Sequence, residues 1–241
     1  MPTYNKANND VERAAFLRRA ANTGTADIAA GTPYLGQATV DEVTALAATY
    51  ETALSALSTN QSGRSREIRQ RQEAIETLAT YVRDFWEVAR RRARRLGQPA
   101  EVLTFYGLPL DGMSPNPSTA DEWLTWAGTV VQGDAEAVTA GYAAMSNPSA
   151  VEITAVLTTA QQEVTEANAA DRTYDQSQEQ LAEVRAQADQ LIDDVMAELR
   201  FTLRRKDAAS QRRVMRTYGA VFTYLDGEPR DPDDQPEEPV A

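Results

Sequence analysis

Neither cysteine nor histidine occurs in this sequence. Without cysteine the chain can form no disulfide, no thiolate metal site and no cysteine nucleophile. Without histidine it lacks the commonest general base and the commonest transition-metal ligand, which excludes a Ser-His-Asp triad and the Glu-x-x-His di-iron pattern of helical bundles. Only Lys6 and Lys206 remain as candidates for a Schiff base. We therefore predict that the protein is not an enzyme, with no catalytic residue, no cofactor and no metal site.

Long apolar runs are also missing. No stretch approaches about 18 apolar residues, and the first nine residues hold no apolar segment, so we expect neither a transmembrane helix nor a Sec-type signal peptide. The predicted location is cytoplasmic, and export without a cleaved signal stays open. Aromatic residues make up only 7% of the chain, and much of the apolar fraction is alanine. This composition predicts an all-α fold.

Positive charge is missing from one long segment. Residues 96–171 contain ten acidic residues and no lysine or arginine, although the chain has 22 arginines and a net charge of −12. Residues 226–241 carry seven acidic groups, one arginine and four prolines. Such a tail cannot bury a core, so it is predicted to be disordered, as are the polar residues 1–9.

An internal duplication organises the chain. Residues 8–107 recur in altered form as residues 118–219, at an offset of 110 that drifts to 112 near the end. Apolar positions, helix caps and turn glycines recur, but no catalytic constellation does. Among these glycines, Gly107 and Gly219 are expected to provide left-handed helix caps. The predicted order is a disordered lead (1–9), helical copy 1 (10–107), a Pro/Gly linker (108–117), helical copy 2 (118–225) and the acidic tail (226–241).

Copy 1 is predicted to form a helical hairpin. A capping box from Thr39 to Glu42 opens its first long helix, the polar run 58–63 ends that helix, and a second long helix covers about 65–96. Gly24 is expected to end the short helix that precedes them.

Copy 2 is predicted to form an equivalent hairpin. Capping boxes at Thr119–Glu122 and Ser149–Glu152 open a short helix, interrupted at Gly133, and a third long helix. The third and fourth long helices, about 150–168 and 173–206, have no glycine between them and are expected to run on more continuously. Two such hairpins predict a pseudo-twofold four-helix bundle with short flanking helices, and no strand-like alternation persists.

The most prominent motif is the run 90–95, in which only Ala93 is not an arginine. One interpretation is a phosphate-binding patch. The other is a set of cations favoured by the dipole at a helix C-terminus, at about 0.3–1 kcal/mol each. Copy 2 repeats the feature at Arg204 and Arg205. Repetition at the same helix end favours a structural role or pairing with an acidic protein surface, and the net negative charge opposes nonspecific nucleic-acid binding.

Two further groups of residues have competing interpretations. Carboxylates on the second long helix, Glu73, Glu76, Asp84 and Glu87, have spacings found in bundle metal sites, but such sites normally include histidine, so solvated helix faces explain them better. Trp123 is either a core residue or part of a partner-binding edge in the segment that lacks basic residues.

The predicted function is that of a non-enzymatic structural or assembly protein, which acts through protein–protein contacts as a homo-oligomer or with a protein partner. Opposite charges on the arginine-rich helix ends and on the segment without basic residues favour head-to-tail self-association. The alternative is a nucleic-acid-associated protein that uses the same helix ends and is inhibited by its acidic tail. The predicted partner-binding residues are Arg90, Arg91, Arg92, Arg94, Arg95, Arg204, Arg205, Arg212, Arg213, Asp121, Glu122 and Trp123.

Overall fold

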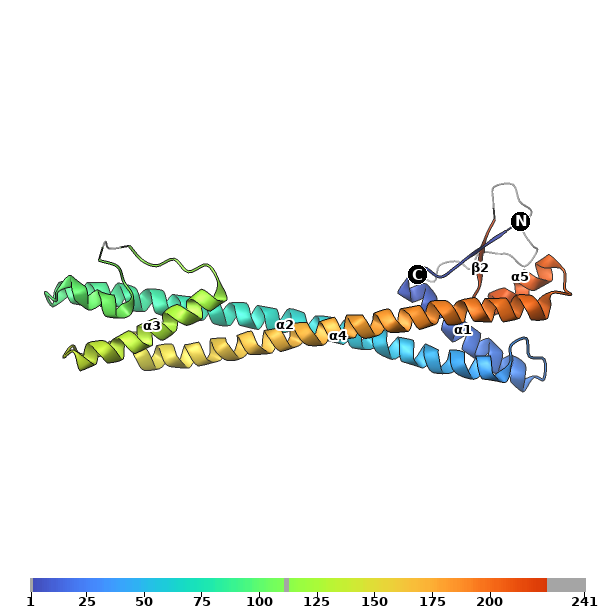
Figure 1. The fold of residues 1–241 in the computed structure, drawn as a ribbon, viewed down its shortest axis with the longest axis horizontal. Helices are drawn as coiled ribbons and strands as arrows, with labels where there is room; N and C mark the ends of the chain where they lie inside the picture. The colour runs from blue at the N-terminus through green and yellow to red at the C-terminus, as the bar shows by residue number, and fades with distance from the viewer. Residues whose placement is uncertain (1, 111–112, 225–241) are drawn as a thin grey trace. The chain divides into compact units, whose positions relative to one another are not determined.

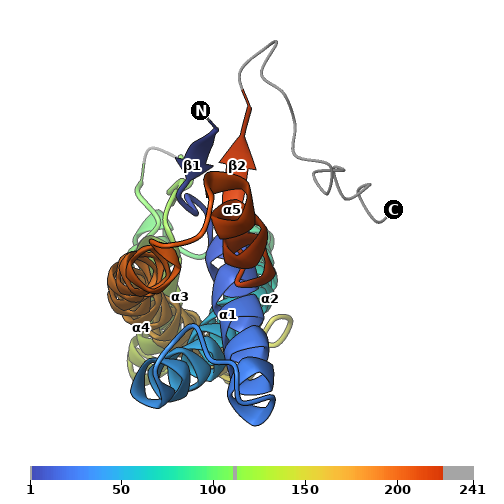
Figure 2. The same ribbon diagram turned by 90° about the vertical axis from the view of Figure 1, so that its right-hand side faces the viewer.

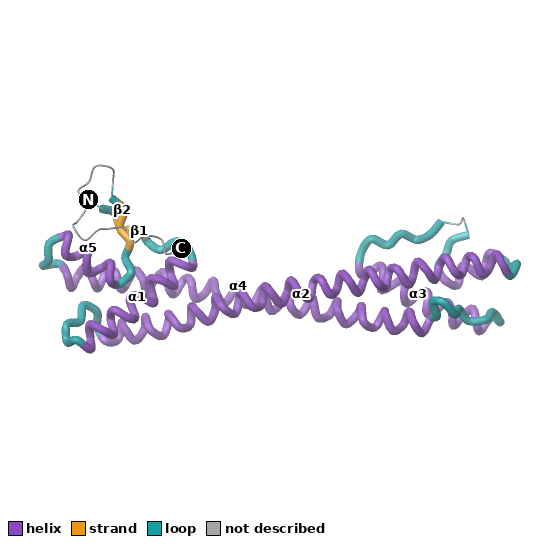
Figure 3. Tube along the Cα trace, turned by 180° about the vertical axis from the view of Figure 1, so that it is seen from behind, coloured by secondary structure: helices purple, strands orange, loops and turns teal. Residues whose placement is uncertain are grey.

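The computed structural model describes residues 2–110 and 113–224. Within them the chain is all-α, as predicted, and 77% helical, with one pair of short strands (Figure 1, Figure 3). The elements in chain order are β1 (Thr3–Asn5), α1 (Asp10–Ala29), α2 (Gln37–Arg95), the 3₁₀ helix η1 (Ala100–Tyr106), α3 (Ala120–Thr139), α4 (Ala150–Leu203), α5 (Ala208–Thr217) and β2 (Val221–Thr223). None of the described helices combines the length and the apolarity that crossing a membrane requires.

The chain divides into two compact units. Unit 1 comprises residues 1–59 and 175–241, and unit 2 comprises residues 60–174. Helices α2 and α4 each contribute one part to unit 1 and the other part to unit 2. The predicted acidic tail, 226–241, lies outside the described residues.

The predicted hairpins are wrong, because each pair of expected long helices is one continuous helix. Helix α2 runs through the polar residues 58–63, and α4 runs through residues 168–173, where continuity was the expectation. A glycine inside a helix costs only about 1 kcal/mol relative to alanine, so Gly63 alone does not break α2. Most of the neighbouring polar side chains are exposed, where they cost the helix little. Two long helices with shorter helices packed on them therefore replace the expected four-helix bundle.

Gly24 and Gly133 do not end helices, contrary to expectation, but lie inside α1 and α3. A Cβ atom added at Gly24 would lie 2.6 Å from Cγ2 of Val40, and one added at Gly133 would overlap the carbonyl oxygen of Phe105. Both glycines therefore allow close packing, of α1 on α2 and of α3 on η1.

Two of the three predicted capping boxes are present. Those at Thr119–Glu122 and Ser149–Glu152 form reciprocal hydrogen bonds at the starts of α3 and α4. The box predicted at Thr39 is wrong, since α2 begins two residues earlier. Glu198 of α4 caps this end instead, because its carboxylate accepts hydrogen bonds from the backbone N–H of Gly36 and from the hydroxyl of Thr39, both at 2.7 Å.

The core of unit 1 lies between α1, the first part of α2, the second part of α4 and α5 (Figure 2). Fully buried side chains come from every one of these segments: Leu17 from α1, Tyr50 from α2, Leu199 from α4, and Tyr218 directly after α5. The expected left-handed cap at Gly219, with φ of 101°, then leads the chain from α5 to β2.

The core of unit 2 lies between the second part of α2, η1, α3 and the first part of α4. Trp86 of α2 is only 1% exposed, and its indole nitrogen donates to the carbonyl oxygen of Tyr106 at 3.1 Å. The ring centroids of Trp123 and Trp126 on α3 lie 6.4 and 5.5 Å from that of Trp86. The expected left-handed cap after η1 is confirmed at Gly107, whose φ is 70°.

The lead that was expected to be disordered contains strand β1, which pairs antiparallel with β2 in unit 1. Tyr4 stands opposite Phe222, and their ring centroids are 6.0 Å apart. The guanidinium of Arg200 lies 5.6 Å from the Tyr4 ring, and that of Arg216 lies 5.4 Å from the Phe222 ring. These aromatic and cation–π contacts give a polar segment enough stabilisation to form a short strand.

Candidate functional site

Two arginines of the run that ends α2 bind the chain's own loops. Arg90 donates to the hydroxyl of Ser114 and to the carbonyl oxygen of Met113, both at 2.6 Å. Arg92 donates to the carbonyl oxygens of residues 144 and 143, at 2.8 and 2.5 Å. Arg92 thereby holds the C-terminus of α2 against the α3–α4 loop within unit 2. Both arginines are structural, and their guanidinium groups are already used by the fold.

The other three arginines of the run face solvent. Arg91 pairs with Glu87 one turn earlier at 2.6 Å, and 73% of the Arg91 side chain is exposed. Arg94 and Arg95 are exposed, and within the described residues neither side chain forms a hydrogen bond or an ion pair. All three lie in the last turns of α2, where the helix dipole favours positive charge. Arg94 and Arg95 therefore keep their full hydrogen-bonding capacity for another molecule.

The basic residues predicted in copy 2 lie in unit 1. Arg204 and Arg205 directly follow α4 and are exposed. Arg204 donates to the carbonyl oxygen of Phe201 at 2.7 Å, and its guanidinium lies 4.0 Å from the centroid of the Phe201 ring. On α5, Arg212 is half-buried and Arg213 is exposed. The predicted basic residues thus form two groups, one in each unit.

Of the three acidic and aromatic residues predicted to bind a partner, Glu122 and Trp123 have structural roles in α3. Glu122 completes the cap of α3, where the backbone N–H groups of residues 118–119 lower the pKa of its carboxyl group. Asp121 is exposed in the same turn. Trp123 is only 5% exposed and lies beneath the guanidinium of Arg83, 4.5 Å from the ring centroid. Trp123 is therefore a core residue of unit 2 and not an exposed partner-binding edge.

A groove between α3 and α4 opens next to the loop that Arg92 holds, and the sequence analysis did not identify it. Its volume is about 530 Å³, and its lining consists of Val131, Asp134, Ala135, Ala150, Val151, Thr154 and Ala155. Among these residues Asp134 alone is charged, and its Oδ1 accepts the backbone N–H of Met145 at 3.0 Å. Val151 is 79% exposed. The one indication in the sequence is that Val151 is apolar but lies outside the buried stripe of α4.

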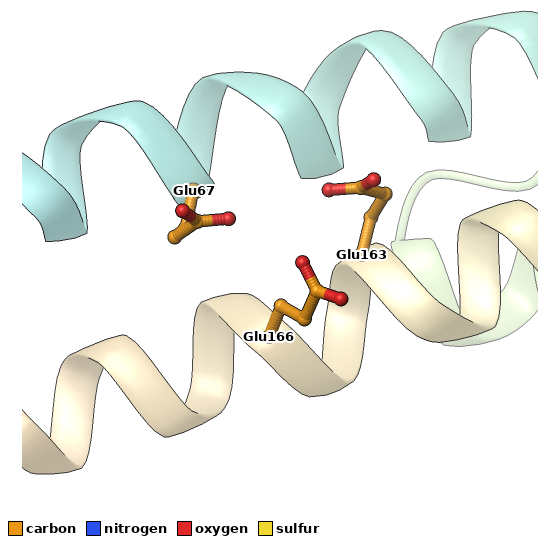
Figure 4. Close-up of side chains that lie close together, drawn as sticks. All are labelled: Glu67, Glu163 and Glu166. Carbon is orange, nitrogen blue, oxygen red and sulfur yellow. The ribbon is translucent and has the colours of Figure 1, made fainter.

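Three glutamates meet inside unit 2: Glu67 of α2 with Glu163 and Glu166 of α4 (Figure 4). One carboxylate oxygen of each lies within 4.8 Å of the others. Oε2 of Glu163 is buried without a hydrogen-bond partner, whereas Glu67 accepts from Arg66 at 2.7 Å and Glu166 accepts from Gln162 at 2.8 Å. Carboxylate oxygens are the ligands that Ca²⁺ and Mg²⁺ prefer, so these residues could supply part of a coordination shell.

The carboxylates singled out from the sequence do not belong to this group. Glu73, Glu76, Asp84 and Glu87 are all exposed on α2, as solvated helix faces would be. The glutamate cluster was missed because its members come from two helices that are far apart in the sequence. Its only local sign is the spacing of three between Glu163 and Glu166.

A second charged network joins α1 to α2 and α4 in unit 1. The guanidinium of Arg185 binds both oxygens of Asp10, at 2.7 and 2.6 Å, and the hydroxyl of Tyr50 donates to the same carboxylate at 2.7 Å. The bonds from Arg185 hold the pKa of Asp10 at about 2. Burial, reinforced by the bond to Asp10, raises the pKa of Tyr50 to about 12. Arg13 makes a similar two-point contact with Asp189, at 2.8 and 3.0 Å.

The comparisons with known proteins add no assignment. No protein-family model matches the chain, and no curated protein or solved structure is significantly similar to it.

Proposed function

We propose that this chain is a non-enzymatic structural or assembly protein that acts through protein–protein contacts, and that its partner is a second copy of itself. One observation carries the proposal: Arg94 and Arg95 are exposed without a partner in the described residues, beside an α3–α4 surface that contains no basic residue. Opposite charges on one molecule favour self-association, because each copy offers the surface that the other requires.

The contacts of Arg90 and Arg92 within the chain show which arginines of the run are available to a partner. Arg90 and Arg92 bind loop carbonyl groups, so they fix the end of α2 and leave the binding to their neighbours. Within residues 2–110 and 113–224, three of the eight exposed large apolar side chains lie near the α3–α4 loop: Leu96 directly after α2, Val138 in the last turn of α3 and Val151 in the first turn of α4. Exposed apolar groups rimmed by charge are typical of protein interfaces.

We further infer that the chain consists of two copies of one helical unit. Each half has a short helix, a long helix and a second short helix in that order. Side chains at equivalent positions are buried in both halves, as in the pairs Leu17 and Ala127, Val43 and Ile153, Phe85 and Val195, and Trp86 and Met196. Residues 1–110 produced alone should then associate in pairs, because two such fragments supply the parts of both units. A fragment that stays unfolded at every concentration would contradict this inference.

Light scattering after size-exclusion chromatography tests the self-association. The full chain should show a mass above that of one copy at about 50 mM salt. The mass should fall toward one copy near 1 M salt, where screening reduces the Debye length to about 3 Å. A monomer at every concentration and salt would eliminate the proposal.

A nucleic-acid binding assay tests the alternative function. Binding to DNA or RNA through exposed arginines should be strongest at about 50 mM salt and should weaken steeply as salt rises. If the chain without residues 226–241 binds neither nucleic acid under these conditions, the arginines do not serve that function.

A further inference from the structure

We infer that the acidic tail, residues 226–241, docks on a basic surface of unit 1 in the same copy. This basic surface is formed by the lysine and arginine side chains of residues 200–216, at the end of α4 and on α5. The inference goes beyond the proposed self-association, because it concerns unit 1 and requires no second copy.

Positive charge is concentrated in residues 200–216, which contain seven basic residues and a single acidic one, Asp207. Asp207 caps α5, where its carboxylate accepts the backbone N–H of Ser210 at 3.0 Å. Arg204 and Arg205 are exposed, and neither forms an ion pair with a carboxylate in the part of the chain that the structure describes. The end of α4 therefore carries positive charge that the described carboxylates do not neutralise.

The basic surface extends from α4 to α5 across the strand pair, which lies next to α5 (Figure 2). The guanidinium of Arg200 on α4 lies 5.6 Å from the Tyr4 ring, which lies 6.0 Å from the Phe222 ring. On the other side, the guanidinium of Arg216 lies 5.4 Å from the Phe222 ring and donates to the hydroxyl of Tyr224 at 2.9 Å. Two arginines thus flank the strand that leads into the acidic tail.

Charge and position identify the acidic tail as the occupant. It contains seven acidic residues and one arginine, the converse of the seven basic residues and one acidic residue in 200–216. It begins three residues after β2 ends at Thr223. Helix α5 has 10 residues and is therefore about 15 Å long, whereas sixteen residues of extended chain span up to about 50 Å. The acidic tail can therefore reach the whole basic surface.

The short tether makes weak contacts sufficient. A segment attached this close to its binding surface has an effective concentration on the order of millimolar, so ion pairs that are individually weak can hold it. Any other anion that binds the basic surface must compete with the acidic tail. Its apparent affinity is lowered in proportion to the fraction of molecules in which the tail is undocked.

A fluorophore on the acidic tail of the full chain reports the contact. Because the chain has no cysteine, Gln235→Cys introduces a single labelling site in the tail. At nanomolar protein and about 50 mM salt, the fluorescence anisotropy should be high, since a docked tail rotates with the folded protein. It should fall as salt approaches 1 M, where screening reduces the Debye length to about 3 Å.

Glutamine at Arg204 and Arg205 tests the basic surface. Both side chains are exposed, so the fold should be kept, and circular dichroism verifies this. The docking constant should fall about fourfold, at about twofold per exposed ion pair, so the tail should be released at lower salt. The same substitutions at Arg94 and Arg95 are the matched control, because these are adjacent exposed arginines at the end of α2. The control should release its tail at the same salt as the wild type.

Each other outcome contradicts the inference. A low anisotropy that does not depend on salt means that the acidic tail does not dock. Equal changes in the two arginine variants assign the contact to overall charge and not to the basic surface. Anisotropy that becomes high only when unlabelled protein is added in excess places the tail on a second copy. Light scattering reports self-association separately, so a monomer with a docked tail would eliminate the proposed function and leave this inference standing.

Discussion

Replacing Asp10 by asparagine should reveal how much the charged network contributes to unit 1. The shift of the Asp10 pKa from 3.8 to about 2 sets an upper limit of roughly 2.5 kcal/mol, since one pKa unit corresponds to about 1.4 kcal/mol. The Arg185 side chain is 40% exposed, so solvent screens the pair. We therefore expect Asp10→Asn to lower the free energy of unfolding by about 1–2 kcal/mol at pH 7.

The direction of the pKa shift of Asp10 determines how its contribution to stability changes with pH. The pKa of Asp10 is lower in the folded state than in the unfolded chain, so its stabilisation is complete above about pH 4 and is lost as the pH falls toward 2. The wild type should lose this contribution across that window, and Asp10→Asn has no such contribution to lose. The difference in unfolding free energy between the two proteins should therefore shrink steadily from pH 4 to pH 2.

Urea unfolding followed by circular dichroism, at neutral pH and at several values between 4 and 2, measures both effects. Asp121→Asn is the control, because it removes an exposed aspartate from the first turn of α3. It should cost only the helix-dipole contribution, about 0.3–1 kcal/mol. If Asp10→Asn costs no more than Asp121→Asn, or if its difference from the wild type is the same at pH 2 as at pH 7, the charged network does not stabilise unit 1 in this way.

Three other substitutions give separate tests by chemical or thermal unfolding. Gly133→Ala should destabilise unit 2 by more than about 2 kcal/mol, because the new Cβ overlaps the carbonyl oxygen of Phe105. Gly128→Ala is the control, because the space around its Cβ is open, and it should stabilise the same helix by about 0.5–1 kcal/mol. Equal effects of the two substitutions would show that α3 does not approach η1 closely. Trp86→Ala should cost about 3–5 kcal/mol, as expected for a ring that is 1% exposed, and a loss under about 1 kcal/mol would place that ring on the surface. Glu163→Gln, measured with a chelator present, should raise the stability by about 0.5 kcal/mol because it relieves repulsion among carboxylates within 4.8 Å of one another, and a lower stability would mean that repulsion does not govern the cluster.

Most elements that depend on local sequence were predicted correctly, although the capping box at Thr39 was not. The capping boxes of α3 and α4 and the left-handed caps at Gly107 and Gly219 are set by side chains or backbone within a few residues, and all are present. Glycine inside a helix was the main source of error. The sequence around Gly133 resembles a helix stop, and only the approach of Phe105 from another element shows that the position needs a residue without a side chain. Such information is not local, so hydrophobic spacing cannot supply it.

The same distinction governs the candidate site. The arginine run was recognised from the sequence. Its division into arginines that bind the chain's own loops and arginines that face solvent was not, because the carbonyl groups that bind Arg90 and Arg92 lie 23 to 52 residues away in the sequence. The residues next to Trp123 in the sequence do not show whether its side chain is buried or exposed. It is buried because Trp86 and Arg83 of α2 pack against its ring. The groove and the glutamate cluster each need two segments brought together by the fold, so the sequence alone gave no account of them.

The way α2 and α4 are shared between the units has a consequence for a broken chain. A single cut between residues 110 and 113 would yield two fragments, each of which supplies helices to both cores. Neither fragment could dissociate without exposing the buried residues of both units. The cleaved protein should therefore elute as a single species in size-exclusion chromatography until denaturant unfolds both units. The connection between the two halves would then speed their association during folding, but would not be needed to hold them together afterwards. The two fragments, produced separately, should serve as a pair of reporters that reassemble spontaneously.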